Sequence, residues 1–75
     1  MQIKIGFTQN SRELVITSEA EQDAVLPQIR EFLGSENPRQ VLQLEGAKGS
    51  QFLVLREQVA YVEVGSSAKN AVGFL

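Results

Sequence analysis

The sequence predicts one small α+β domain over residues 1–75, a mainly antiparallel sheet with one helix packed on one face. A chain of 75 residues is long enough for one domain only. Short segments with apolar–polar alternation, typical of strands, lie on both sides of one segment with helical periodicity. The predicted order is β-β-α-β-β-β, with residues 71–75 (AVGFL) as an optional short sixth strand. A sheet with one solvent-facing side and a partly closed small barrel both fit this order.

Two strands are predicted ahead of the helix. Residues 2–8 (QIKIGFT) alternate apolar and polar side chains, and residues 14–16 return as the second strand of a hairpin. In the turn between them, Asn10 is the residue best suited to a left-handed backbone conformation. Gly6 lies on the polar face of the first strand. A glycine at such a position indicates a bulge or a close contact of the backbone.

The helix is predicted from a stripe of apolar side chains that recur at i, i+4, i+7 and i+8. This spacing places them on one face, which we expect to be buried against the sheet. The stripe consists of Val25, Ile29, Phe32 and Leu33.

The start of the helix depends on Pro27. Ser18 and Glu21 have the spacing of a capping box, which would begin the helix at Glu19. That start leaves Pro27 in the helix interior, where proline removes a hydrogen bond and bends or breaks the helix. We therefore favour a helix with its regular part at Ala24–Leu33, so that the proline lies in or near the first turn.

Three further strands are predicted in the second half of the chain. Residues 41–45 (VLQLE) alternate, and a turn at residues 46–49 leads back into the run 52–55 (FLVL). This run contains no polar residue, which indicates a strand buried on both faces. A polar corner at residues 56–58 joins it to residues 59–64, a strand with one buried face. We expect these last two strands to form the ribbon that the rest of the chain covers.

The composition argues against several functional classes. The chain has no cysteine and no histidine, so it has no disulfide and lacks the usual ligands of a structural zinc site and the usual activators of a nucleophilic serine. We expect no cofactor, no metal and no enzymatic activity. The net charge is −2 and no basic run occurs, which argues against a dedicated DNA-binding protein. No apolar stretch is long enough to span a membrane and no signal peptide is recognisable, so a cytoplasmic location is expected.

Four residues are candidates for binding a ligand: Lys48, Gly49, Arg56 and Tyr61. Lys48 and Gly49 occupy a glycine-rich turn whose backbone amides could cradle an anion, but a phosphate loop has a different residue order and precedes a helix. An ordinary hairpin turn is the more frequent outcome of such a pattern. Arg56 lies beside the carboxylate of Glu57, where a surface ion pair is the common outcome. Tyr61 is the only tyrosine, and it stacks on a base, anchors a partner or covers the edge of the core.

Four short motifs resemble a known family: KIG at residues 4–6, SREL at 11–14, AYVEVG at 60–65 and VGF at 72–74. They extend over nearly the whole chain. The chain is similar to a small actinobacterial domain family of unknown function, whose single-domain members are sometimes catalogued only as "ATP-binding protein". The resemblance implies a cytoplasmic α+β protein and supplies no catalytic residue. Pro27 and the lysine-bearing turn depart from the pattern of that family.

These observations favour a non-enzymatic interaction module that binds a protein partner or a second copy of itself. Catalytic side chains are missing, and several short strands offer sheet edges for strand addition. The alternative hypothesis is a domain that binds a nucleotide or single-stranded RNA through Tyr61, Lys48 and Arg56.

Overall fold

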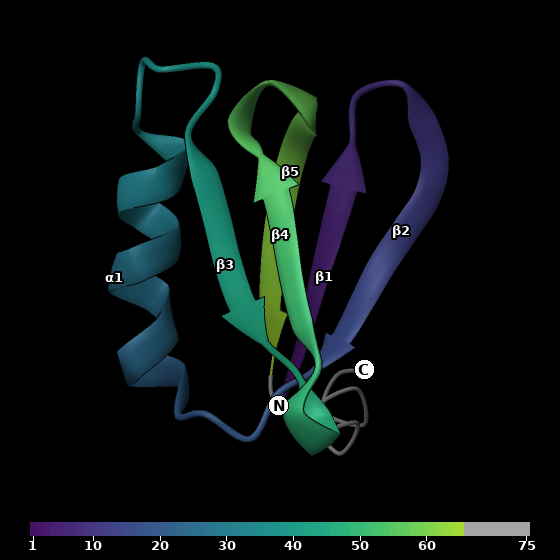
Figure 1. Ribbon diagram of the computed structural model, residues 1–75, viewed down its shortest axis with the longest axis vertical. Helices are drawn as coiled ribbons and strands as arrows, with labels where there is room; N and C mark the ends of the chain where they lie inside the picture. Colours follow the sequence, from purple (N-terminus) through teal and green to yellow (C-terminus); the bar gives the residue numbers. More distant parts are fainter. Residues whose placement is uncertain (66–75) are drawn as a thin grey trace, which may run out of the picture.

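A computed structural model of the chain describes residues 1–65 and confirms the predicted α+β class and element order (Figure 1). The optional sixth strand at residues 71–75 lies outside the described residues. The elements are β1 (Gln2–Phe7), β2 (Asn10–Thr17), α1 (Gln22–Leu33), β3 (Val41–Glu45), the 3-10 turn η1 (Ala47–Gly49), β4 (Gln51–Leu55), the 3-10 turn η2 (Arg56–Gln58) and β5 (Val59–Gly65).

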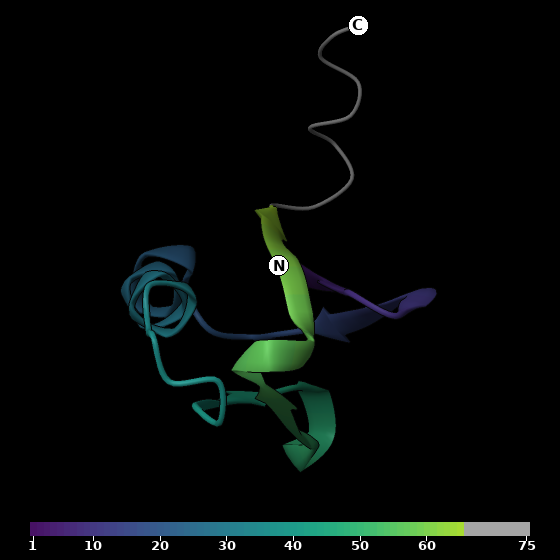
Figure 2. The ribbon, with the colours of Figure 1, turned by 90° about the horizontal axis from the view of Figure 1, so that it is seen from above.

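The strands form two antiparallel sheets, not one. β1 is the central strand of a three-stranded sheet of order β2-β1-β5, whereas β3 and β4 pair only with each other. The expected ribbon of β4 and β5 is therefore wrong, because η2 takes the chain out of one sheet and into the other. In Figure 2 the sheets lie in different layers, with α1 at one side, where it packs against β5 and β3.

The hydrophobic core lies between the inner faces of the two sheets and the apolar face of α1. Alternation along each strand places every second side chain on the inner face. The predicted helix stripe is confirmed for its first three members, which are among the buried residues, and Leu33 packs at the margin. The buried apolar residues are Ile3, Ile5, Ile16, Val25, Ile29, Phe32, Leu42, Leu44 and Val59.

β4 differs from its prediction as a strand buried on both faces. Phe52 and Val54 face the core, but the side chains of Leu53 and Leu55 are 61% and 38% exposed. Within residues 1–65, no element covers the outer face of the β3–β4 hairpin. The run FLVL is thus apolar on a face that the described part of the chain leaves in solvent.

The turn between β1 and β2 is shorter than predicted. Asn10 is already the first residue of β2, and its Oδ1 accepts a hydrogen bond from the backbone N–H of Arg12 at 2.9 Å. The prediction of a left-handed Asn10 is wrong, since Lys48 is the only non-glycine residue with positive φ among those described. The Asn10 side chain instead satisfies a local donor.

The predicted capping box is not formed. Ser18 Oγ accepts a hydrogen bond from the N–H of Ala20 at 3.1 Å, and the N-cap of α1 is Glu21, without a side-chain cap. The helix begins at Gln22, earlier than the favoured start, and Pro27 lies inside it. Because the Pro27 side chain is exposed, its ring points away from the core and does not disturb packing.

Pro27 leaves α1 without one backbone hydrogen bond, because proline has no N–H to donate to the carbonyl of Asp23. We expect Pro27→Ala to raise the free energy of unfolding by about 1–3 kcal/mol, since an interior proline costs about 3 kcal/mol relative to alanine. Urea unfolding followed by circular dichroism measures the change. Pro38→Ala, in the loop after α1, is the control, and it should leave stability unchanged or lower it by about 1 kcal/mol at most. A lower stability of Pro27→Ala would contradict this account of the helix.

Candidate functional site

The edge of β4 that faces away from β3 carries main-chain groups without a partner among the described residues. The β3–β4 ladder is flanked by two hydrogen-bonded pairs, in which Gly46 N–H donates to Ser50 at 2.7 Å and Arg56 N–H to Gln40 at 2.8 Å. Hydrogen-bonded and non-bonded pairs alternate along an antiparallel ladder. The even-numbered residues of β4 therefore bond to β3, and its odd-numbered residues direct N–H and C=O groups outward.

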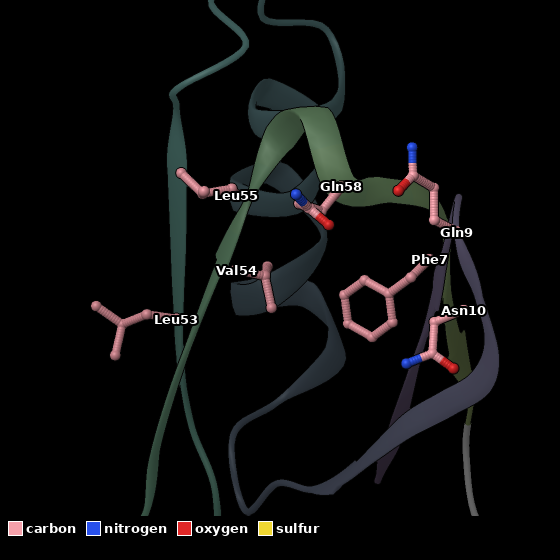
Figure 3. A pocket seen from close by; sticks show the side chains of 7 residues that line it. All are labelled: Phe7, Gln9, Asn10, Leu53, Val54, Leu55 and Gln58. Atoms are coloured by element: carbon pink, nitrogen blue, oxygen red, sulfur yellow. The ribbon is translucent and has the colours of Figure 1, made fainter.

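A groove of about 520 Å³ lies beside this edge, a size typical of ligand-binding clefts. One wall is β4, and the other is formed by the end of β1 and the turn into β2. Figure 3 shows the Phe7 ring and the Val54 side chain directed toward one another across it, whereas Leu53 and Leu55 project from the opposite side of β4. The lining residues are Phe7, Gln9, Asn10, Leu53, Val54, Leu55 and Gln58, none of them charged.

An apolar patch continues the site onto the outer face of the hairpin. Leu55 is paired across the ladder with Val41, which is 46% exposed, and Leu53 is the most exposed large apolar side chain of the described residues. We call Val41, Leu53 and Leu55 the outer patch. Apolar groups that are contiguous on a surface often mark an interaction site.

The other sheet edges of the described structure carry charged side chains or lie beside α1. The free edge of β2 carries the charged side chains of Arg12 and Glu13. α1 contacts β3 and β5, whose sequences include Glu45 and Glu63, and the side-chain amide of Gln28 donates to the carbonyl of Gln43 in β3 at 3.3 Å. A second groove, between Gln28 and Leu44, leaves part of the β3 edge uncovered. Charges and covering elements are the usual means by which proteins prevent unwanted strand pairing. β4 has neither protection: its sequence is QFLVL, without charge or proline.

The structure does not bring the four sequence-predicted ligand residues together. Lys48 and Gly49 lie in η1 with φ of 63° and 79°, ahead of β4. Arg56 follows the other end of β4, about 17 Å away along a five-residue strand. Tyr61 lies on the outer face of the three-stranded sheet. These positions are in three separate parts of the surface.

Arg56 holds elements of the fold together. Its Nε donates to the carbonyl of Leu33 at the end of α1, and its Nη1 donates to the carbonyl of Val59, both at 3.2 Å. A cation at a helix C-terminus is also favoured by the helix dipole. The guanidinium is therefore engaged in main-chain contacts of its own chain.

Tyr61 lies flat across β1. Gly6 is its neighbour in the β1–β5 register, and a Cβ atom at Gly6 would overlap the Tyr61 ring. The ring thereby reaches β2, where its hydroxyl donates to the carboxylate of Glu13. The prediction for Gly6 is confirmed in both parts, because the ladder is also irregular beside it.

This hydrogen bond raises the pKa of Tyr61 above its usual value of about 10. The donated bond to Glu13 is the largest cause, followed by partial desolvation and by the negative charges of Glu13 and Glu63. Each disfavours a phenolate at this place. Because the folded protein holds this proton more tightly, the linked stabilisation is fully present below pH about 10 and is lost as the pH rises through the folded pKa.

Within residues 1–65, no group of three carboxylates gathers to hold a metal ion, and no buried polar side-chain atom lacks a hydrogen-bond partner. No helix in this part of the chain is long and apolar enough to cross a membrane. The fold and the groove define a small α+β domain with an uncharged surface cleft beside an open strand edge.

The chain belongs to the family described as "Protein of unknown function (DUF3107)", whose model matches residues 1–75. This match confirms the resemblance to a small domain family of unknown function. No curated protein matches the chain.

Sequence reasoning did not identify the groove. Its lining combines residues from both halves of the chain, and amides and apolar side chains do not form a chemical motif. One signal was present in the sequence: β4 is the strand without a charge or a proline, which is unusual for a strand at a sheet edge.

The titration of Tyr61 tests the contact with Glu13. The chain has one tyrosine and no tryptophan, so the ultraviolet absorbance of phenolate reports this residue alone. We expect a pKa above the usual value in the wild type, and a lower pKa in Glu13→Gln and in Gly6→Ala, whose added Cβ displaces the ring. Glu19→Gln, in the exposed segment before α1, is the matched control and should leave the pKa unchanged. An unshifted wild-type tyrosine would contradict the contact.

Proposed function

We propose that this protein is a non-enzymatic interaction module, which binds a protein partner by accepting a strand at the free edge of β4. The proposal is supported by one observation above the others: β4 is the sheet edge of residues 1–65 that neither a charge nor a packed element protects. Main-chain hydrogen bonds give such a complex its affinity, and the side-chain pockets beside the edge give it specificity.

The surroundings of the edge support binding. The outer patch and the groove add apolar area on both faces of β4, so a guest strand buries apolar side chains as well as main-chain groups. Burial of apolar surface contributes about 25 cal/mol per Å² before the costs of association are subtracted.

Nucleotide or RNA binding has less support from the geometry. Arg56 is engaged with two carbonyls, and Lys48 lies beyond the opposite end of β4. Base stacking on Tyr61 requires cations along the path of the phosphates. On the same face, Lys4 is paired across the ladder with Glu63, which reduces the positive field there.

The test uses two matched variants. Leu53→Lys places a charge at the β4 edge, and Val15→Lys places the same charge on β2; both native side chains are exposed, so neither change disturbs the core. We expect affinity capture from lysate, with chemical cross-linking, to yield a partner cross-linked near β4 with the wild type and with Val15→Lys. Leu53→Lys should lose at least nine-tenths of that partner. Equal capture by all three proteins would contradict the proposal.

A second copy of the chain is the alternative partner. Light scattering over a range of protein concentrations distinguishes the two cases. A dimer that Leu53→Lys dissociates and Val15→Lys does not would place self-association at β4, and a monomer at all concentrations would leave a different protein as the partner.

A further inference from the structure

We propose that the partner supplies a short, extended and uncharged segment, and that one of its apolar side chains packs between Phe7 and Val54. The inference rests on the proposed strand addition at β4 and specifies what is bound there. The guest is a linear segment of about five residues, the length of β4, rather than the edge of a folded domain.

A second wall limits the space beside the β4 edge. In both Figure 1 and Figure 2, β2 extends beyond β4 on the side away from β3. Phe7, Gln9 and Asn10 therefore form a second wall opposite the β4 edge. One strand occupies about 5 Å beside an edge. A single strand fits between these walls, whereas the second layer of a folded domain meets the β1–β2 hairpin.

The outer face of the β3–β4 hairpin offers little area to a folded partner. The outer face of the hairpin is two strands wide and five residues long, or about 10 Å by 17 Å, which is roughly 170 Å². A stable complex of two folded proteins buries about 800 Å² on each partner. The outer patch alone is therefore too small to hold a second copy of the chain, and the groove must contribute. A linear segment is the guest that engages the groove, the edge and the patch at the same time.

The absence of charge in the groove restricts which side chains a guest segment can place there. The groove contains no charged side chain to pair with a guest charge. Burying an unpaired charge costs several kcal/mol or more, so the residues that face the groove are uncharged. Gln9, Asn10 and Gln58 each carry an amide, which contains both donors and an acceptor. Asn10 already accepts a bond from Arg12 with its oxygen, which leaves its NH₂ group to donate to a guest carbonyl.

Strand geometry determines which side chains of the guest segment face Phe7 and Val54. Successive side chains of a guest strand point to opposite faces, so every second one faces the inner side of the hairpin. On that side Phe7 and Val54 are directed toward one another across the groove (Figure 3). The other guest side chains lie beside Leu53 and Leu55 on the outer patch. The recognised segment thus has apolar side chains in alternation.

The experiment is an amide chemical-shift titration of the ¹⁵N-labelled full chain with two capped peptides. One is Thr-Val-Thr-Val-Thr, and the other, Thr-Lys-Thr-Lys-Thr, has the same length and carries charged lysine in place of apolar valine at the two inward positions. We expect the valine peptide to cause saturable shifts at Phe7, Asn10 and residues 51–58. The lysine peptide should bind at least about tenfold more weakly, which corresponds to about 1.4 kcal/mol.

Two variants of the protein test the geometry. The N–H of Leu53 points away from β3, so Leu53→Pro removes an edge donor without removing a ladder bond, and it should abolish the shifts. Gln58→Ala changes an exposed groove side chain only, and it should weaken binding several-fold in a protein that folds as the wild type does. Gln40→Ala, exposed and outside the groove, is the control and should bind as the wild type.

The outcomes separate this inference from the proposed function. Three results would overturn the proposal of an uncharged linear segment: equal binding of both peptides, chemical shifts that map away from β4, or unchanged binding by Leu53→Pro. If neither peptide binds while a folded partner is captured through β4, strand addition stands and the linear segment is wrong. If no partner is captured through β4 and no peptide binds, both are wrong.

Discussion

The two sheets have more outer edges than one helix can cover. This constraint determines which main-chain groups remain exposed at the surface of the described residues. Two sheets have four outer edges, and each presents main-chain groups that need a partner or solvent. α1 lies beside β3 and β5, the outer strands at two of these edges, and both strands also carry a glutamate. Charged side chains protect the third, on β2. The fourth edge, on β4, remains open among the described residues, and it is the one bordered by exposed leucines.

The corner between β4 and β5 determines where this open edge lies. η2 separates the two strands, so that β5 pairs with β1 and β4 is left with one neighbour. Arg56 fixes the corner through its contacts with Leu33 and Val59, which join the end of α1 to the start of β5. Hydrogen bonds to a charged group contribute about 1.5–3 kcal/mol each when well formed. The same corner directs β4 toward the turn between β1 and β2 and so creates the groove.

Local patterns predicted the elements well, because periodicity reflects which face is buried. The stripe of Val25, Ile29 and Phe32 and the alternation of residues 2–8 correspond to observed inner faces. The run FLVL was assigned incorrectly, since a strand buried on both faces and a strand with one exposed apolar face have the same pattern. Pro27 was placed by its usual preference, but an exposed proline is tolerated where packing of the rest of the helix outweighs the lost bond.

The candidate site was less predictable, because it depends on how distant segments meet. Phe7 and Asn10 approach β4 only when the two sheets are stacked, and the contact of Tyr61 with Glu13 joins residues 48 positions apart. Charged residues such as Lys48 and Arg56 were predicted from the sequence as candidates for ligand binding. In the structure one occupies a turn and the other binds carbonyls of its own chain. The groove consists of residue types that no motif identifies.

The most direct test of the central claim is native-state hydrogen exchange of the β4 amides in the full chain. An open edge predicts an alternation along the strand, with slow exchange at Phe52 and Val54, which bond to β3, and fast exchange at Gln51, Leu53 and Leu55. β1, which is paired on both sides, should be protected without such alternation. Slow exchange at all five β4 amides would mean that the edge is already covered, and would contradict the account.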